Sequence, residues 1–515
     1  MPSLKKMSLF ITSATVIALL LLWVGWQGDV AAALFSRLQD TMASSTGWLL
    51  ILIMNAVLLF SLYLLFTPLA RIRLGGPDAR PEFSRLDWFG MLFAAGMGIG
   101  LLFYSVSEPL QHYASFGPYL DSDAATAQVS MEMTFLHWGL HPWGIYALVG
   151  LTLAFFHYNT GHRLSFEAPL RELLPPAWAR RVGWVANMAA VIGTIFGITT
   201  SLGLGASQAS AGIAELTGLD ASLGLNLGVI GVVCALAMVS VLSGLGNGVR
   251  LLSKLNLIIA AGLMLFVLFA GQPLFIFKAL GEHLGTYIND LPKLSTWNET
   301  YTGTQWQSQW TIFYWSWWIS WSPFVGMFIA QVSRGRTIRE YLLGVLFVPT
   351  LFNFLWMTVF GSNALFLELF ENAGFAEIVT VAPNESLYRL LDYLPFSTFT
   401  TGVAVLVVLI FFVTSADSGA LVVSTLTSNG NAPSWRQRFF WVAAVGLVTA
   451  FLLRAGGLDA LQSAAIASGL PFGLLLLTFI PALRIALRRP YVRPDDHATP
   501  PRDAAANKPV DDPRN

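Results

Sequence analysis

The chain has 515 residues, of which 55% are hydrophobic and only 11% are charged. Soluble proteins carry about 25% charged residues, so this composition excludes an ordinary soluble domain. The net charge of zero and the lack of a basic stripe argue against nucleic-acid binding. The single cysteine, Cys234, cannot form an internal disulfide.

The apolar residues gather in twelve long blocks, each long enough to cross a bilayer core as a helix of roughly 20 residues. The blocks are 8–27, 47–67, 88–107, 134–157, 184–206, 226–242, 255–274, 309–330, 341–361, 401–427, 436–453 and 459–483. The first is longer than the apolar part of a typical signal peptide, so we expect an uncleaved helix. The sequence therefore predicts an all-α polytopic membrane protein with 12 transmembrane helices.

The basic residues are distributed unevenly over the loops between these blocks. If both termini are cytoplasmic, 24 of the 29 Lys and Arg residues fall on the cytoplasmic side. Positive residues collect on that side of membrane proteins. This asymmetry predicts twelve helices, cytoplasmic termini and a location in the plasma (inner) membrane.

Two blocks contain residues that weaken helices. The third, WFGMLFAAGMGIGLLFYSVSEP, includes Gly96, Gly98 and Gly100, and the eighth, WTIFYWSWWISWSPFVGMF, includes Pro323 and Gly326. Gly lowers helix propensity and Pro removes a backbone donor, so we expect both helices to be interrupted. Close helix packing is the alternative explanation for the glycines.

Interrupted helices at matching positions of two inverted halves mark the substrate site of secondary transporters. The eighth block follows the third by five helices and runs in the opposite direction. We therefore expect two inverted five-helix repeats. The predicted parts are helices 1 and 2 in 1–87, a first repeat in 88–274, an external loop in 275–308, a second repeat in 309–489 and a disordered cytoplasmic tail in 490–515.

Tryptophan is concentrated in WTIFYWSWWISW, residues 310–321, which holds five of the 18 tryptophans. Trp310, like Trp88 and Trp184, lies at the start of its block, where aromatic residues anchor helices at the membrane interface. The other expected positions lie deeper, in two clusters: Trp317, Trp318 and Trp321 in the eighth block, and Trp138, Trp143 and Tyr146 in the fourth. Facing sets of such rings form cages for quaternary cations, each contact contributing roughly 0.5–2 kcal/mol.

Acidic residues are scarce near these clusters. Glu108 and Glu132 are expected at helix ends, and Asp417 lies within 401–427. A net cation would select a buried carboxylate as its counter-charge. The predicted partner is therefore a small zwitterion, whose onium group contacts the rings while backbone and Trp N–H groups bind its carboxylate.

Thr414 and Ser415 place adjacent hydroxyls in the otherwise apolar block 401–427. They can bond to the preceding helical turn, as Ser and Thr often do in membrane helices. Together with carbonyls freed by an interrupted helix, they can also coordinate Na⁺. The sequence leaves both interpretations open.

Three motifs resemble signatures of the betaine/choline/carnitine transporter family. They are GMGIG at 96–100, FYWSWWISWSPFVGMFIA at 313–330 and SRGRTIREY at 333–341, and the resemblance covers about residues 8–488. It implies twelve helices, a five-plus-five inverted-repeat core, a homotrimer, and substrates with a quaternary ammonium or sulfonium group. No organic cofactor is expected.

The resemblance also implies roles for individual residues. The family's aromatic box falls on Trp138, Trp143, Tyr146 and Trp318, with Trp317 and Trp321 along the same pathway and Met97, Gly98 and Gly100 in the glycine motif. Its principal sodium site falls on backbone oxygens of Ala94, Met97 and Phe411 and on the hydroxyls of Thr414 and Ser415. A second site matches Thr194 and Phe324, but Ile198 stands where a hydroxyl is expected; the neighbouring Thr199 or Thr200 could substitute.

The family's choline and carnitine carriers commonly have Asp where this chain has Gly100. The resemblance therefore favours Na⁺-coupled symport of glycine betaine or dimethylsulfoniopropionate. Because the C-terminal tail is not strongly basic, we expect weak osmotic regulation. A sodium-independent exchanger or proton-coupled carrier of choline- or carnitine-type compounds is the alternative within the family. A membrane metalloenzyme built on His137 and His141, and on His157 and His162, is an alternative outside it.

Overall fold

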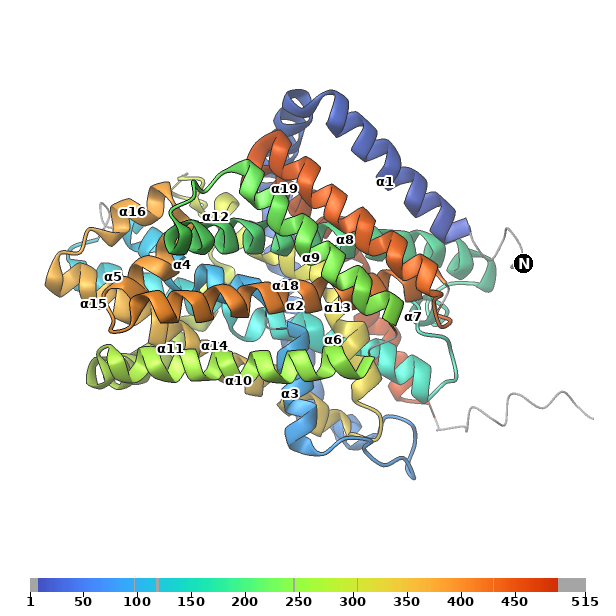
Figure 1. The fold of residues 1–515 in the computed structure, drawn as a ribbon. Coiled ribbons are helices and arrows are strands. Elements are labelled where there is room, and N and C mark those ends of the chain that lie inside the picture. The colour runs from blue at the N-terminus through green and yellow to red at the C-terminus, as the bar shows by residue number, and fades with distance from the viewer. Residues whose placement is uncertain are drawn as a thin grey trace, which may run out of the picture.

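The computed structural model describes residues 8–96, 98–116, 120–243, 246–302, 304–428 and 430–489. Within these ranges the chain is folded almost entirely into helices, and one isolated antiparallel bridge joins Arg73 to Thr337. The predicted all-α class is confirmed (Figure 1).

The helices are α1 Ser8–Trp26, α2 Gly28–Phe66, η2 Pro68–Arg71, α3 Arg85–Gly96, α4 Ile99–Phe116, α5 Asp123–Trp138, α6 Leu140–Tyr158, α7 Glu167–Leu170, α8 Pro176–Thr217, α9 Leu223–Ser243, α10 Gly246–Ala270, α11 Pro273–Thr296, α12 Trp306–Gln309, α13 Thr311–Val332, α14 Ile338–Met357, η4 Thr358–Ser362, α15 Asn363–Glu371, α16 Phe375–Val381, η5 Pro383–Glu385, α17 Ser386–Asp392, α18 Ser397–Thr427 and α19 Trp435–Leu487.

Nine helical stretches in the described part of the chain are long and apolar enough to cross a membrane. They are Ser8–Trp26, Val30–Phe66, Asp123–Tyr158, Pro176–Thr217, Leu223–Leu242, Leu252–Ala270, Ile338–Glu371, Ser397–Thr427 and Trp435–Leu487. This is the architecture of a multi-pass membrane protein. The count of twelve stays a prediction, because α13 and the α3–α4 pair fall outside the nine and α19 covers two predicted blocks.

The third predicted block is interrupted as expected, because α3 ends at Gly96 and α4 begins at Ile99. The expected interruption of the eighth block is wrong: α13 continues through Pro323 to Val332. Pro323 has no N–H for the carbonyl of Ile319 four residues earlier. The hydroxyl of Ser322 donates to that carbonyl at 2.7 Å, so the helix continues without an unpaired acceptor.

The fourth block contains an interruption that the sequence analysis did not predict. Gly139, with φ −90° and ψ −134°, separates α5 from α6. The carbonyls freed there are bonded by side chains of other helices: Trp318 Nε1 donates to His137 O at 2.9 Å, and Asn353 Nδ2 donates to Trp138 O at 2.8 Å. The break thus ties α5 to α13 and α14. A further kink, at Gly456 and Gly457, divides α19.

α13 lies at the centre of the bundle, where it packs against α6, α8 and α19. The five consecutive residues from Tyr314 to Trp318, three of them tryptophans, are all buried. α1 lies at the edge of the molecule against α19 (Figure 1). The short helices α15 and α16 lie at one end of the bundle and α7 at the other (Figure 1).

The SRGRTIREY motif that follows α13 contacts the N-terminal part of α3. The guanidinium of Arg336 lies 4.8 Å from the ring centroid of Trp88, and Trp88 Nε1 donates to Ser333 Oγ at 3.0 Å. Trp88 is fully buried within the protein, and its expected place at the membrane interface stays a prediction. Trp184, in contrast, is 38% exposed, as an interfacial side chain would be.

Candidate functional site

The glycine motif at the α3–α4 junction lies directly against the tryptophans. A Cβ atom added to Gly96 would lie 2.2 Å from Cη2 of Trp143, and one added to Gly100 would lie 2.6 Å from Cη2 of Trp317. At Gly98 the nearest atom, Cη2 of Trp321, would be 3.8 Å away. Gly96 and Gly100 are therefore required by the close approach of rings from α6 and α13, whereas Gly98 has room for a methyl group.

The structure brings the predicted aromatic residues of α5, α6 and α13 into one cluster. The ring centroids of Trp138 and Trp318 lie 5.0 Å apart, those of Trp317 and Trp318 4.6 Å, those of Trp143 and Tyr146 5.5 Å, and those of Tyr146 and Trp318 6.4 Å. A cation between two facing rings lies up to about 6 Å from each centroid. Of these pairs only Trp317 and Trp318 are stacked face to face, and at 4.6 Å no group fits between them.

Two polar tips in this cluster have no hydrogen-bond partner among the described residues: the hydroxyl of Tyr146 and Nε1 of Trp321. Both are buried. By contrast, Nε1 of Trp317 donates to the carbonyl of Gly197 at 3.3 Å. Because buried polar groups are nearly always paired, these two donors are available to the acceptor oxygens of a water or a ligand.

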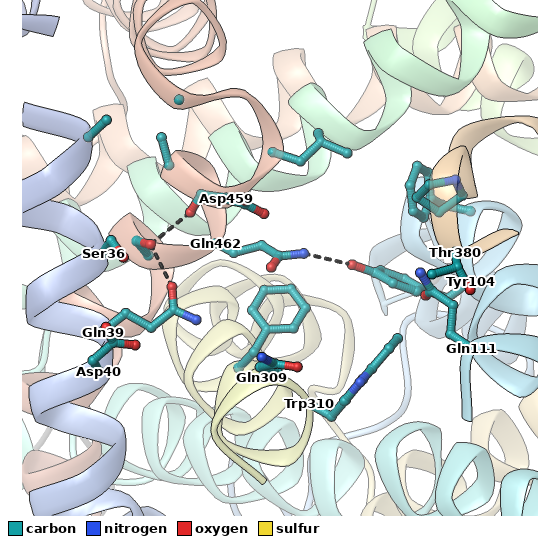
Figure 2. Close-up of a pocket in the computed structure, with 18 of the residues that line it drawn as sticks. Ser36, Gln39, Asp40, Tyr104, Gln111, Gln309, Trp310, Thr380, Asp459 and Gln462 are labelled. Carbon is teal, nitrogen blue, oxygen red and sulfur yellow. Dashed lines mark hydrogen bonds between the residues drawn. The ribbon is translucent and has the colours of Figure 1, made fainter. Parts of the chain in front are cut away.

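A cavity of about 680 Å³ lies beside the aromatic cluster, and we call it the vestibule. Figure 2 shows its walls: Gln39 and Asp40 of α2, Tyr104 of α4, Trp310 before α13, and Gln462 of α19. Trp310, expected at the interface, is thus part of this wall and lies 4.4 Å from the ring of His112.

Tyr104 separates the vestibule from the aromatic cluster. Its hydroxyl accepts a hydrogen bond from Gln462 Nε2 at 3.3 Å, shown as a dashed line in Figure 2. Its ring lies 6.0 Å from that of Trp317 and 6.2 Å from that of Trp138. Tyr104 thus contacts both the vestibule and the rings of the cluster, a position that the sequence analysis did not single out.

The expectation that no carboxylate lies beside the rings is wrong. Glu108 is within α4 rather than at its end, is fully buried, and accepts a hydrogen bond from Trp138 Nε1 at 2.7 Å. Glu132 is likewise inside α5 and buried. Asp417 lies in α18 as expected, and it pairs with Arg438 at 2.7 Å. A buried acid therefore contacts a predicted substrate residue.

The principal sodium site is described only in part. Met97 lies outside the described residues, and Ala94 lies in α3. The hydroxyl of Thr414 donates to the carbonyl of Ile410 at 2.9 Å and lies 3.1 Å from that of Phe411. Donation to the preceding turn leaves the hydroxyl's lone pairs available to a cation. Ser415 follows in the same helix, partly buried, and the site stays a prediction.

The second predicted sodium site contains unpaired oxygens. Thr194 is fully buried, and its hydroxyl has no partner among the described side chains and backbone; Phe324 is also buried. The hydroxyl of Thr199 is unpaired in the same way, whereas that of Thr200 lies 2.9 Å from two carbonyl oxygens. Of the two residues that could replace the hydroxyl missing at Ile198, Thr199 has the unpaired hydroxyl, while Thr200 donates to carbonyls and keeps its lone pairs as Thr414 does.

Comparison with known proteins gives consistent matches over nearly the whole chain. The model of the betaine/carnitine/choline family of transporters matches residues 8–491. The glycine betaine transporter OpuD of Bacillus subtilis is 38% identical over 487 residues, covering 94% of each chain. A glycine betaine/proline/choline transporter of Vibrio parahaemolyticus is 41% identical, covering 86% of this chain and 83% of that one. The high-affinity choline transport protein of Escherichia coli is 38% identical, covering 93% and 72%.

Proposed function

Because the chain belongs to the betaine/carnitine/choline family of transporters, we propose that it is a sodium-coupled symporter of a zwitterionic quaternary ammonium or sulfonium compound. Glycine betaine and dimethylsulfoniopropionate are the expected substrates. The observation that carries the proposal is the cluster of buried rings with two unpaired donors, Tyr146 OH and Trp321 Nε1. Rings bind the onium group and the donors bind the carboxylate.

The chain is a transporter and not an enzyme, so the metalloenzyme alternative is wrong. The histidines that suggested it have other contacts. His137 Nδ1 lies 2.7 Å from Glu108 Oε1, and His141 Nε2 lies 3.3 Å from Asn55 Oδ1. These contacts place both histidines in the packing around the aromatic cluster.

The proposed architecture has twelve transmembrane helices, a five-plus-five inverted repeat and cytoplasmic termini in the inner membrane. The kink at Gly456 and Gly457 supports counting α19 as two spans. α7, from a predicted cytoplasmic loop, lies at the opposite end of the bundle from α15 and α16, which come from a predicted external loop (Figure 1). The homotrimer rests on the family resemblance alone.

Transport by this route requires movements of α4 and α13 side chains. Tyr104 must open for the solute to leave the vestibule, and the stacked Trp317 and Trp318 must separate to admit the onium group. The interrupted α3–α4 backbone allows such changes because its glycines have no side chains to clash. One Na⁺ moving down about 100 mV and a tenfold gradient supplies roughly 3.7 kcal/mol, enough for several-hundredfold accumulation of a neutral solute.

The test is uptake by purified protein in proteoliposomes, with and without a sodium gradient. The panel is glycine betaine, dimethylsulfoniopropionate, choline, carnitine and ectoine. We expect Thr414→Ala with Ser415→Ala to abolish sodium-stimulated uptake. Thr425→Ala is the matched control, because Thr425 also bonds to its own helix, at 2.8 Å from Leu421 O, but is outside the predicted site. Equal counterflow without sodium would establish an exchanger instead.

One observation favours a second candidate, carriage of a cation such as choline. Glu108 is a buried carboxylate in contact with Trp138, and a buried acid is what a cationic substrate would select. The unpaired donors at Tyr146 and Trp321 favour the zwitterion. The uptake panel decides between the two substrates by the ratio of choline to glycine betaine transport.

A further inference from the structure

The carboxylate of Glu108 is surrounded by four donors. Oε1 lies 2.7 Å from His137 Nδ1 and 3.3 Å from His112 Nε2. Oε2 lies 2.7 Å from Trp138 Nε1 and 2.5 Å from the hydroxyl of Tyr314. A carboxylate that accepts several hydrogen bonds is stabilised in its ionised form. The geometry is therefore that of a buried anion.

This anion is not neutralised by a Lys or Arg. In the described ranges its ion-pair partners are His112 and His137. Nε2 of His137 lies 3.0 Å from Thr311 Oγ1, which can donate to it. Nδ1 of His112 has no partner among the described atoms. The two imidazoles are therefore the only titratable bases that the described part of the chain places against this carboxylate.

The carboxylate of Glu108 lies next to the aromatic cluster, against the indole nitrogen of Trp138. Glu108 bonds the indole nitrogen of Trp138, whose ring is 5.0 Å from that of Trp318. Nε1 of Trp318 in turn donates to the backbone carbonyl of His137, and the imidazole of the same residue contacts Glu108 through Nδ1. A cation on the faces of these two rings therefore lies within the field of the carboxylate, which a water-excluded site screens weakly.

We propose that Glu108 is the counter-charge of the onium group, acting through Trp138, and that it sets the preference between cationic and zwitterionic substrates. Glu108 does not touch the substrate; it holds Trp138 in place and adds a negative potential behind its ring. The net cation gains the full attraction. A zwitterion gains less, because its own carboxylate is repelled. The inference rests on the proposed transport of onium compounds.

The experiment compares the KM of choline with that of glycine betaine in proteoliposomes containing full-length variants. Glu108→Gln removes the charge, and we expect the KM for choline to rise about tenfold and that for glycine betaine by about threefold or less. Glu108→Asp keeps the charge and should restore the wild-type ratio of the two constants. A purely structural role would raise both constants by the same factor.

Glu108→Gln also replaces one acceptor oxygen with an NH2 group, which the imidazoles of His112 and His137 can accept by changing tautomer while the remaining oxygen accepts from Trp138. As a second comparison, the double variant Glu108→Gln with Tyr314→Phe is set against Tyr314→Phe alone, its matched control, in which one hydrogen bond is lost and the charge is kept. We expect the ratio of the choline KM to the glycine betaine KM to change in the double variant, which lacks the charge, and not in Tyr314→Phe, which keeps it. An equal ratio in the control and the double variant would overturn the inference. A wild-type protein that takes up no onium compound would instead overturn the proposed function.

Discussion

The α3–α4 junction and α13 contain similar numbers of helix-weakening residues but differ in outcome. The junction, with Gly96, Gly98 and Gly100, is interrupted, whereas α13 continues through Pro323. In α13 the neighbouring Ser322 bonds the carbonyl that proline leaves unpaired. In α13 a side chain of the same helix thus pairs the carbonyl that proline frees, and this lets the helix continue.

The two regions divide the work of the site. The junction supplies space, because a side chain at Gly96 or Gly100 would overlap a tryptophan ring. α13 supplies rings and keeps them in register, since a continuous helix fixes their spacing. Variants can therefore fill the space at the α3–α4 junction, remove a ring from α13, or remove the hydrogen bond that keeps α13 continuous, each separately.

Removing the space should have the largest effect. In Gly100→Ala the added Cβ would lie 2.6 Å from Cη2 of Trp317 and 3.1 Å from that of Trp138. Overpacking of this kind costs about 1–3 kcal/mol, so we expect uptake to fall about fivefold or more. Gly90→Ala is the control, because its Cβ would meet nothing within 4 Å. Gly98→Ala should cause little loss, because its Cβ would lie 3.8 Å from Cη2 of Trp321, an ordinary van der Waals contact. Full uptake by Gly100→Ala would show that the rings are not confined at this junction.

Removing a ring should have a smaller effect, seen in affinity. Trp318→Leu loses one onium contact of about 0.5–2 kcal/mol, so the KM for glycine betaine should rise about two- to thirtyfold. Trp318→Phe keeps a ring and should raise it less. Trp315→Leu is the control: Trp315 is as buried, but it stacks on His141 at 5.2 Å and lies outside the box. If the Trp315 and Trp318 variants change KM equally, the rings act through packing and not as an onium site.

The sequence was sufficient to predict the membrane class, the family and the residues of the aromatic cluster, because length, hydropathy and motif are local properties. It could not predict the break at Gly139, since that conformation depends on Trp318 and Asn353 bonding carbonyls across the bundle. It also misplaced Glu108: an acid in an apolar block suggests a helix end. His112, four residues further along α4, was the available sign of a buried partner.

Removing the support for continuity should have the smallest effect on uptake and a clear one on stability. Ser322→Ala leaves the carbonyl of Ile319 buried and unpaired, which costs about 1–2 kcal/mol of folding free energy. Adding Pro323→Ala supplies a backbone N–H for the same carbonyl, so the double variant should regain the lost stability. The measurement is the fraction of protein that stays monodisperse in detergent after heating. If the double variant is instead less stable than Ser322→Ala alone, Ser322 does not compensate for Pro323. The rings packed around α13 would then be what keeps the helix continuous.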